Sequence, residues 1–178
     1  MTTEGFIPRV FCCAMLALLF YGTCRADPVV WLDDNVDLRG KRTFFVPQVR
    51  NQTGKTFDID PTALVSSGFH EDLRKEGINI LERRDMSLDF VTVEISLVEY
   101  APGSAAQRWL LPGAGATVCV ARVTLTDGKS GKLLGEIVAN NSVGAGGLFS
   151  VGADTSVPEY VGREIAQALI ALVKKQQP

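Results

Sequence analysis

Residues 89–100 read DFVTVEISLVEY, the most regular pattern in the 178-residue chain. Apolar and polar side chains alternate in it, with Val91, Val93, Ile95 and Leu97 against Thr92, Glu94 and Ser96. A period of two is typical of a strand with one buried face and one face in water. The stretch therefore predicts an antiparallel sheet that covers a core with one face.

The sequence that follows supplies partners for this strand. Residues 117–126 form a second strand-like run, and residues 127–131 read DGKSG, which has the chemistry of a turn. A third strand is therefore expected over residues 132–142, running back along the second as a hairpin.

Two shorter strands are expected before the alternating stretch. Residues 43–49 are rich in strand formers, and Pro47, which has no N–H, indicates an edge position or a bulge near the end of that strand. Residues 78–81 form a short apolar run that predicts another strand.

Two helices complete the pattern. Asp60 and Pro61 predict the N-cap and first turn of a helix, and Gly77 predicts its C-terminal end. Its apolar stripe is Val65, Phe69 and Leu73. Pro158 is expected to open a final helix, whose buried stripe is Val161, Ile165, Ala168, Leu169 and Leu172.

The order β-α-β-β-β-β-α predicts an α+β fold. We expect a two-layer sandwich: a mostly antiparallel sheet of four to five strands with two helices packed on one face. Residues 43–178 are expected to form a single domain. The acidic residues 27–42 are interpreted as an extended, loosely held segment that leads into it.

Residues 1–26 are typical of a secretory signal peptide. Residues 10–20 are continuously apolar, a length that suits the hydrophobic region of a signal but falls short of the roughly 20 residues of a spanning helix. Cleavage before Asp27 is the favoured processing, because small residues stand at the required positions. The alternative is lipidation of Cys24, although Tyr21 and Thr23 depart from the lipobox. Either way we expect a periplasmic or outer-membrane-associated protein.

Charge argues against nucleic acid as a partner. The chain carries 18 Lys and Arg against 20 Asp and Glu, a formal net charge of −2. Phosphate neutralisation supplies much of the affinity for nucleic acids, and no basic face is evident in the sequence.

The residues of the chain predict no catalytic, cofactor or metal site. His70 is the only histidine and has no nucleophile context, so it is interpreted as a solvated helix residue. Cys119 lies in an apolar strand and is expected to be a buried, inert thiol. Glu94 and Glu99 are five residues apart, which places them on opposite faces of a regular strand and does not make an acid–base pair. The glycine-rich stretches lack the context of phosphate loops. We therefore expect no enzyme and no cofactor.

Two long loops, residues 101–116 and 143–157, carry large apolar side chains among glycines. These side chains either fold back over the core or form an interaction surface, as exposed apolar patches do. The candidate interaction residues are Trp109, Leu110, Leu111, Leu148, Phe149 and Val151.

The sequence also resembles known envelope proteins. Residues 44–47 and 51–54, followed by a helix and residues 77–80, resemble the opening shared by the amino-terminal domain of the Tol translocation protein and curli-secretion-type lipoproteins. The later half resembles an uncharacterised family of Gram-negative lipoprotein-like domains of unknown function. Its matching pieces are Arg108, Gly113, Gly115, the strand Val118 to Thr126, the turn Asp127 to Gly131, the glycine-rich run from Gly144, and Ile165-Ala166 in the final helix.

This resemblance implies an envelope location and a role in assembly. We therefore expect a non-enzymatic cell-envelope protein that contacts other envelope proteins or associates with itself. It would reach the membrane only through an anchor at Cys24 or through a partner. The alternative is a periplasmic protein that binds a glycan or an apolar molecule between the two long loops.

Overall fold

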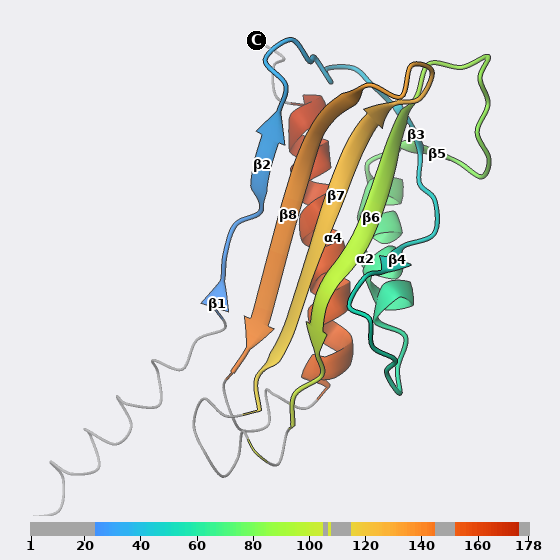
Figure 1. Ribbon diagram of the computed structural model, residues 1–178. Helices are drawn as coiled ribbons and strands as arrows, with labels where there is room; N and C mark the ends of the chain where they lie inside the picture. Colours follow the sequence, from blue (N-terminus) through green and yellow to red (C-terminus); the bar gives the residue numbers. More distant parts are fainter. Residues whose placement is uncertain (1–23, 105–106, 108–114, 145–151, 175–178) are drawn as a thin grey trace, which may run out of the picture.

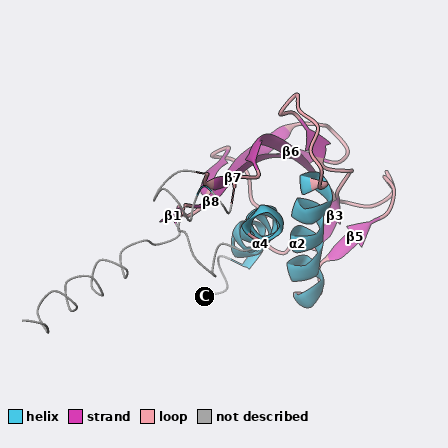
Figure 2. Ribbon diagram, turned by 90° about the horizontal axis from the view of Figure 1, so that it is seen from below, coloured by secondary structure: helices cyan, strands magenta, loops and turns pink. Residues whose placement is uncertain are grey.

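The computed structural model describes residues 24–104, 107, 115–144 and 152–174. They form one twisted sheet with two helices on one of its faces, as Figures 1 and 2 show. This arrangement confirms the expected α+β class. The strands are β1 (Cys24–Arg25), β2 (Val29–Leu32), β3 (Thr43–Phe45), β4 (Arg50–Asn51), β5 (Asn79–Leu81), β6 (Val91–Ala101), β7 (Thr117–Asp127) and β8 (Leu133–Val143). The helices are α2 (Pro61–Lys75) and α4 (Ala153–Lys174).

The sheet is larger and more mixed than the expected four or five mostly antiparallel strands. Its main path is β1-β8-β7-β6-β3-β5, with β2 also on β8 and β4 also on β6. The long strands β6, β7 and β8 are antiparallel, whereas β3, β4 and β5 join in parallel. The parallel part arises because α2 crosses between β3 and β5 and returns the chain in the same direction.

Residues 27–42, which were interpreted as an extended segment leading into the domain, contribute a strand to the sheet. Within them, β2 pairs antiparallel with β8, Val29 opposite Val138 and Leu32 opposite Gly135. The short apolar run of β2 provides the side chains that a pleated strand packs, although acidic residues flank it.

The first strand of the domain is shorter than expected. Thr43–Phe45 forms β3, and the chain pairs again only at β4. Pro47 lies in the interruption between them. It has no backbone N–H to give to a ladder, which accounts for a strand end at this point.

The buried face of β6 is confirmed, although Thr92, expected on the solvent face, is also buried, and a bulge later interrupts the alternation. Val91, Val93, Ile95 and Leu97 are all buried. A β-bulge between Leu97 and Glu99 then shifts the register. As a result Glu94 lies opposite Thr124 and Glu99 opposite Val120, so the two carboxylates share a face, contrary to expectation. They are four residues apart along β7, roughly 13 Å, wider than the spacing of glycosidase carboxylate pairs.

Helix α2 begins and ends as its sequence predicts. The Asp60 side chain caps the helix, accepting hydrogen bonds from the N–H groups of Thr62 and Ala63 at 2.9 and 3.1 Å. At the other end Gly77 has a φ of 67°, and its N–H donates to the carbonyl of Arg74. A left-handed glycine at this position is the usual helix stop.

Helix α4 begins at Ala153, five residues before the predicted start at Pro158. Pro158 has no N–H for the carbonyl of Asp154, one turn earlier. The hydroxyl of Tyr100 donates to that carbonyl instead, at 2.8 Å. A side chain from β6 therefore supplies the donor that the proline lacks, which allows the helix to continue through it.

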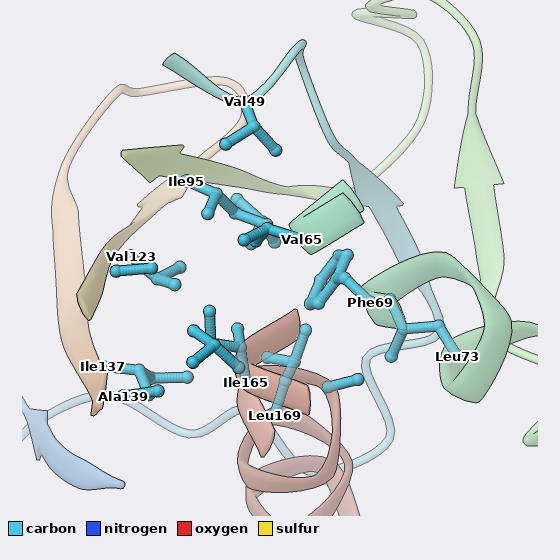
Figure 3. Close-up of a cluster of buried hydrophobic side chains, with 14 of the residues drawn as sticks. Val49, Val65, Phe69, Leu73, Ile95, Val123, Ile137, Ala139, Ile165 and Leu169 are labelled. Carbon is cyan, nitrogen blue, oxygen red and sulfur yellow. The ribbon is translucent and has the colours of Figure 1, made fainter. Parts of the chain in front are cut away.

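The core lies between the helices and the inner face of the sheet, as Figure 3 shows. Phe69 and Leu73 of α2, Ile165 and Leu169 of α4, and Ile137 of β8 are all fully buried. Ala168 and Leu172, which were also expected in the buried stripe of α4, are half-buried. They lie on the side of the helix that faces β2.

Candidate functional site

The first candidate surface is the edge strand β2. Residues along β2 alternate between the faces, so Val29 and Trp31 share the outer face with Val138 and Glu136 of β8. Val29 is 70% exposed and Trp31 is 52% exposed. Large apolar side chains with this exposure on a sheet edge are typical of a protein–protein contact.

Behind β2 lies a groove of about 470 Å³ between this strand and α4. Val30 and Leu32 of β2 line one wall, and Ala168 and Leu172 of α4 line the other. Its remaining lining residues are Asp27, Pro28, Glu164, Gln167 and Ala171. The groove is therefore mostly apolar, with a few polar groups.

Glu164 is the polar group that distinguishes this groove. Its residue is only 2% exposed, and its Oε1 accepts a hydrogen bond of 3.5 Å from Nδ2 of Asn141, which is also buried. Asn141 comes from β8, so the pair links α4 to the sheet. Buried carboxylates cost free energy and are uncommon without a structural or binding role.

The residues with catalytic chemistry lie apart from this groove. His70 is half-buried on α2, and its Nδ1 contacts the backbone oxygen of Ser66 at 2.8 Å and the Ser66 hydroxyl at 3.1 Å. His70 was expected to be a solvated helix residue, and it is partly shielded from solvent because the ring packs back on its own helix turn. His70 and Arg74 border two shallow pockets beside α2.

The thiol and the buried phenol are both hard to ionise. Cys119 is fully buried, and its burial raises the pKa of the thiol to about 12. Burial, followed by the nearby Asp154, raises the pKa of Tyr100 to about 12 as well. Neither group is poised as a nucleophile or base near neutral pH. The buried thiol was expected from the sequence.

The interaction residues predicted from the sequence cannot be placed. Trp109, Leu110, Leu111, Leu148, Phe149 and Val151 lie outside the described residues. Cys24, the predicted lipidation site, lies in β1, where its backbone is opposite Ser142 of β8.

The sequence patterns predicted neither strand β2 nor the burial of Glu164. The signal for β2 was four consecutive apolar residues inside an acidic segment, which we interpreted as a loose leader. The signal for Glu164 was a charged residue between apolar positions of the final helix. Its neighbour Ile165 belongs to the buried stripe. The burial of Glu164 depends on the packing of α4 against β8, which the sequence of the helix does not contain.

The described residues contain neither a candidate metal-binding group of side chains nor a helix that could span a membrane. Within residues 24–104, 107, 115–144 and 152–174, no three His, Cys, Asp or Glu side chains are grouped so that they could hold a metal ion. In the same part of the chain, no helix is both long and apolar enough to cross a membrane.

Comparison with protein families gives one match. Residues 60–147 match the model of a domain of unknown function, DUF4410. The DUF4410 match begins at the cap of α2 and takes in β5, β6, β7 and β8. Neither β2 nor α4, which form the groove, belongs to it. A search of curated proteins found no match for the chain.

Several solved structures share the fold around the DUF4410 region. The PelC dodecamer from Paraburkholderia phytofirmans has a TM-score of 0.51 and 15% identity, covering 82% of this chain and 98% of that one. Protein XCC0632 from Xanthomonas campestris has a TM-score of 0.50 and 9% identity, over 82% of this chain and 92% of its own. A hypothetical protein, CT253, from Chlamydia trachomatis has a TM-score of 0.50 and 10% identity, over 74% and 98%. At these identities the likeness concerns the fold alone.

The family match and the expected resemblance agree at the coarser level. The sequence resembled an uncharacterised domain family of unknown function, and DUF4410 is a domain of unknown function. The resemblance to the Tol domain and to curli-secretion lipoproteins stays a prediction.

Proposed function

We propose that the chain is a non-enzymatic, exported cell-envelope protein that acts through protein–protein contacts, as a component or accessory of an envelope assembly. The observation that carries this proposal is the exposed apolar edge at β2, with Val29 at 70% and Trp31 at 52% exposure. Soluble proteins usually protect such an edge with charges or with covering elements. Here the acidic residues flank β2, while the strand itself is apolar and no other described strand pairs with its outer side, which suits a contact.

Two further observations support the proposal. The leader-like residues 1–26 favour export, with the protein either free in the periplasm or held at the outer membrane. The fold is also compatible with assembly, since PelC, which shares it, forms a dodecamer. His70 contacts its own helix turn, and burial raises the pKa of the Cys119 thiol, so neither residue supports a catalytic role.

Photo-cross-linking at position 31 tests the proposal. A photoreactive amino acid replaces Trp31 in the full chain, and cells are irradiated before the envelope is separated. We expect an adduct whose mass equals two copies of the chain or the chain plus an envelope protein identified by mass spectrometry. The matched control is Lys129, which is exposed in the turn between β7 and β8 and should give no adduct. Equal labelling at both positions, or none at either, would contradict the proposal.

The groove between β2 and α4 favours a second candidate, a periplasmic binder of an apolar molecule with a polar or cationic end. Its walls are apolar and the Glu164 carboxylate lines it. Thermal shift measurements with alkylamines and matched alcohols test this. A bound ligand at 100 times its Kd stabilises the protein by about 2.7 kcal/mol. Amine-selective stabilisation that Glu164→Gln removes would support binding, and no response to either series would count against it.

A further inference from the structure

The described sheet has two open edges, and Figure 2 shows its β5 end and its β8 end on opposite sides of the molecule. On the β8 side the edge strands are β1 and β2, and on the other side they are β4 and β5. In each case the second is the longer strand, with four residues in β2 and three in β5. Each edge presents backbone groups to which another strand could bind.

The direction of these backbone groups follows from the hydrogen bonds that β2 and β5 make with their neighbouring strands. The N–H of Asp33 donates to the carbonyl of Leu134 on β8, so the N–H of Val30, an odd number of residues away, points away from β8. Likewise the N–H of Asn79 donates to the carbonyl of Arg42, which leads into β3. Because N–H groups alternate in direction along a strand, the N–H of Ile80 points away from β3. Both edges therefore present an outward donor at their centre.

The side chains of the two edges also match. On the outer face of the sheet, β2 presents Val29 and Trp31, and β5 presents Leu81, which is opposite Phe45. On the helix side, β2 presents Val30, which is 38% exposed, and β5 presents Ile80, which is half-buried. An apolar residue is therefore available on each face of each edge.

The charges around the two edges are opposite in sign. Residues 27–37, which contain β2, have four carboxylates and no basic side chain. Residues 74–84, which contain β5, have four basic side chains and two acidic ones. Asp34 on the first edge and Arg74 on the second are both exposed. Like charges would oppose pairing of β2 with a second β2, whereas opposite charges favour pairing of β2 with β5.

We propose that the β2 edge of one copy of this chain pairs with the β5 edge of the next copy, in a head-to-tail assembly. This inference rests on the proposed function and names its partner and its surfaces. Within one copy β2 runs antiparallel to β8, and β8 runs in the same direction as β6 because both are antiparallel to β7. Strands β3 and β5 are parallel to β6, so β2 is antiparallel to β5. Copies repeated in one orientation therefore bring β5 against an antiparallel β2. Contacts of this kind generate rings or filaments.

The antiparallel direction also decides which charges meet. In this pairing the C-terminal end of β2 in one copy, which leads to Asp33 and Asp34, lies beside the N-terminal end of β5 in the next. Arg74 and Lys75, at the end of α2, come shortly before that end of β5 in the sequence. The opposite end brings Asp27 towards Arg83 and Arg84. Within one copy Asp33 already pairs with Lys132, and Lys75 pairs with Glu71 and Asp72. The charge complementarity of this pairing is therefore carried mainly by Asp34 and Arg74.

A mixing experiment with two edge variants tests this assignment. Val30→Pro removes the outward donor of β2, and Ile80→Pro removes that of β5, while each leaves the other edge intact. Sedimentation velocity on the full chain, as extracted from the envelope, measures the size of each sample. We expect the wild type to assemble, each variant alone to lose the assembly, and the equimolar mixture to form a dimer and nothing larger.

Each alternative result overturns the assignment. If the Ile80→Pro variant keeps a dimer alone, two β2 edges pair with each other. If both variants assemble as the wild type does, the interface lies elsewhere. If the wild type is monomeric and gives no cross-link at position 31, the proposed function itself is contradicted. If the wild type assembles and both variants assemble equally well, only the pairing of β2 with β5 is contradicted.

A charge exchange keeps the proposal testable if a proline variant does not fold. Asp34→Lys and Arg74→Glu each leave both strands intact and should each weaken assembly by about two- to fivefold, the usual contribution of an exposed ion pair. The double variant should regain most of that loss, because the opposite pair is restored across the interface. The matched control is Arg122→Glu, at an exposed site on β7, the strand flanked by β6 and β8, which should change nothing. A double variant as weak as the sum of both single variants would contradict the assignment.

Discussion

At the scale of single residues, Tyr100 has the most specific role. Its hydroxyl donates at 2.8 Å to the carbonyl of Asp154, which Pro158 leaves without a helical donor. Tyr100→Phe should reduce the free energy of unfolding by about 1–3 kcal/mol, because a part-buried acceptor loses its partner. Urea denaturation measures this. Tyr160→Phe is the control, since Tyr160 is 51% exposed, and an equal loss in both variants would contradict the role of Tyr100.

A second residue-scale prediction concerns the contact between the helices. A Cβ at Gly162 of α4 would lie 2.1 Å from the backbone oxygen of Val65 on α2, and one at Gly68 would lie 2.1 Å from that of Glu159. Gly162→Ala should therefore push the helices apart and cost about 1–3 kcal/mol or more. Thermal denaturation of this variant beside Ser156→Ala, an exposed site on the same helix, checks it. Equal melting temperatures for the two variants would show that the helices can adjust at no cost.

At the scale of elements, the cap of α2 predicts a dependence on pH. Hydrogen bonds from Thr62 and Ala63 hold the pKa of Asp60 below its usual 3.8. A depressed pKa in the folded state stabilises the protein above pH 3.8, and this contribution is lost as the pH falls through the folded value. Asp60→Asn keeps a cap without the charge. The difference in unfolding free energy between wild type and Asp60→Asn should therefore shrink between about pH 5 and pH 2. A constant difference would contradict the charge contribution.

The elements also show what sequence patterns can predict. Local signals were sufficient for α2, for the long strands and for the turn at residues 127–131, where the Asp127 side chain accepts from the N–H groups of Lys129 and Ser130. They failed where a distant group decided the outcome. The extension of α4 through Pro158 depends on Tyr100 from β6, and β2 depends on β8 for its pairing. No local pattern contains such partners, which is why the candidate site at β2 was not predicted.

At the scale of the whole molecule, the predicted processing of residues 1–26 would decide where the sheet of the mature protein begins. Cleavage before Asp27, the favoured prediction, removes β1 and leaves β2 as the first strand of the mature protein. Lipidation would instead keep Cys24 and β1, with the anchor at the end of β8 near Ser142. Intact mass of the protein from a Gram-negative host measures the outcome. We expect a chain that begins at Asp27 and a mass that Cys24→Ala leaves unchanged.

The same measurement bears on the proposed assembly through the β2 edge. A chain that begins at Asp27 carries its new α-ammonium beside that carboxylate. The acidic character of the β2 edge then rests on the other three carboxylates, Asp33, Asp34 and Asp37. An exchange at Asp34 therefore tests assembly whichever way the leader is processed. A mature mass that includes Cys24 and an acyl group would instead contradict cleavage before Asp27. It would also fix one end of the β2 edge at a membrane, and partners would have to approach it along that surface.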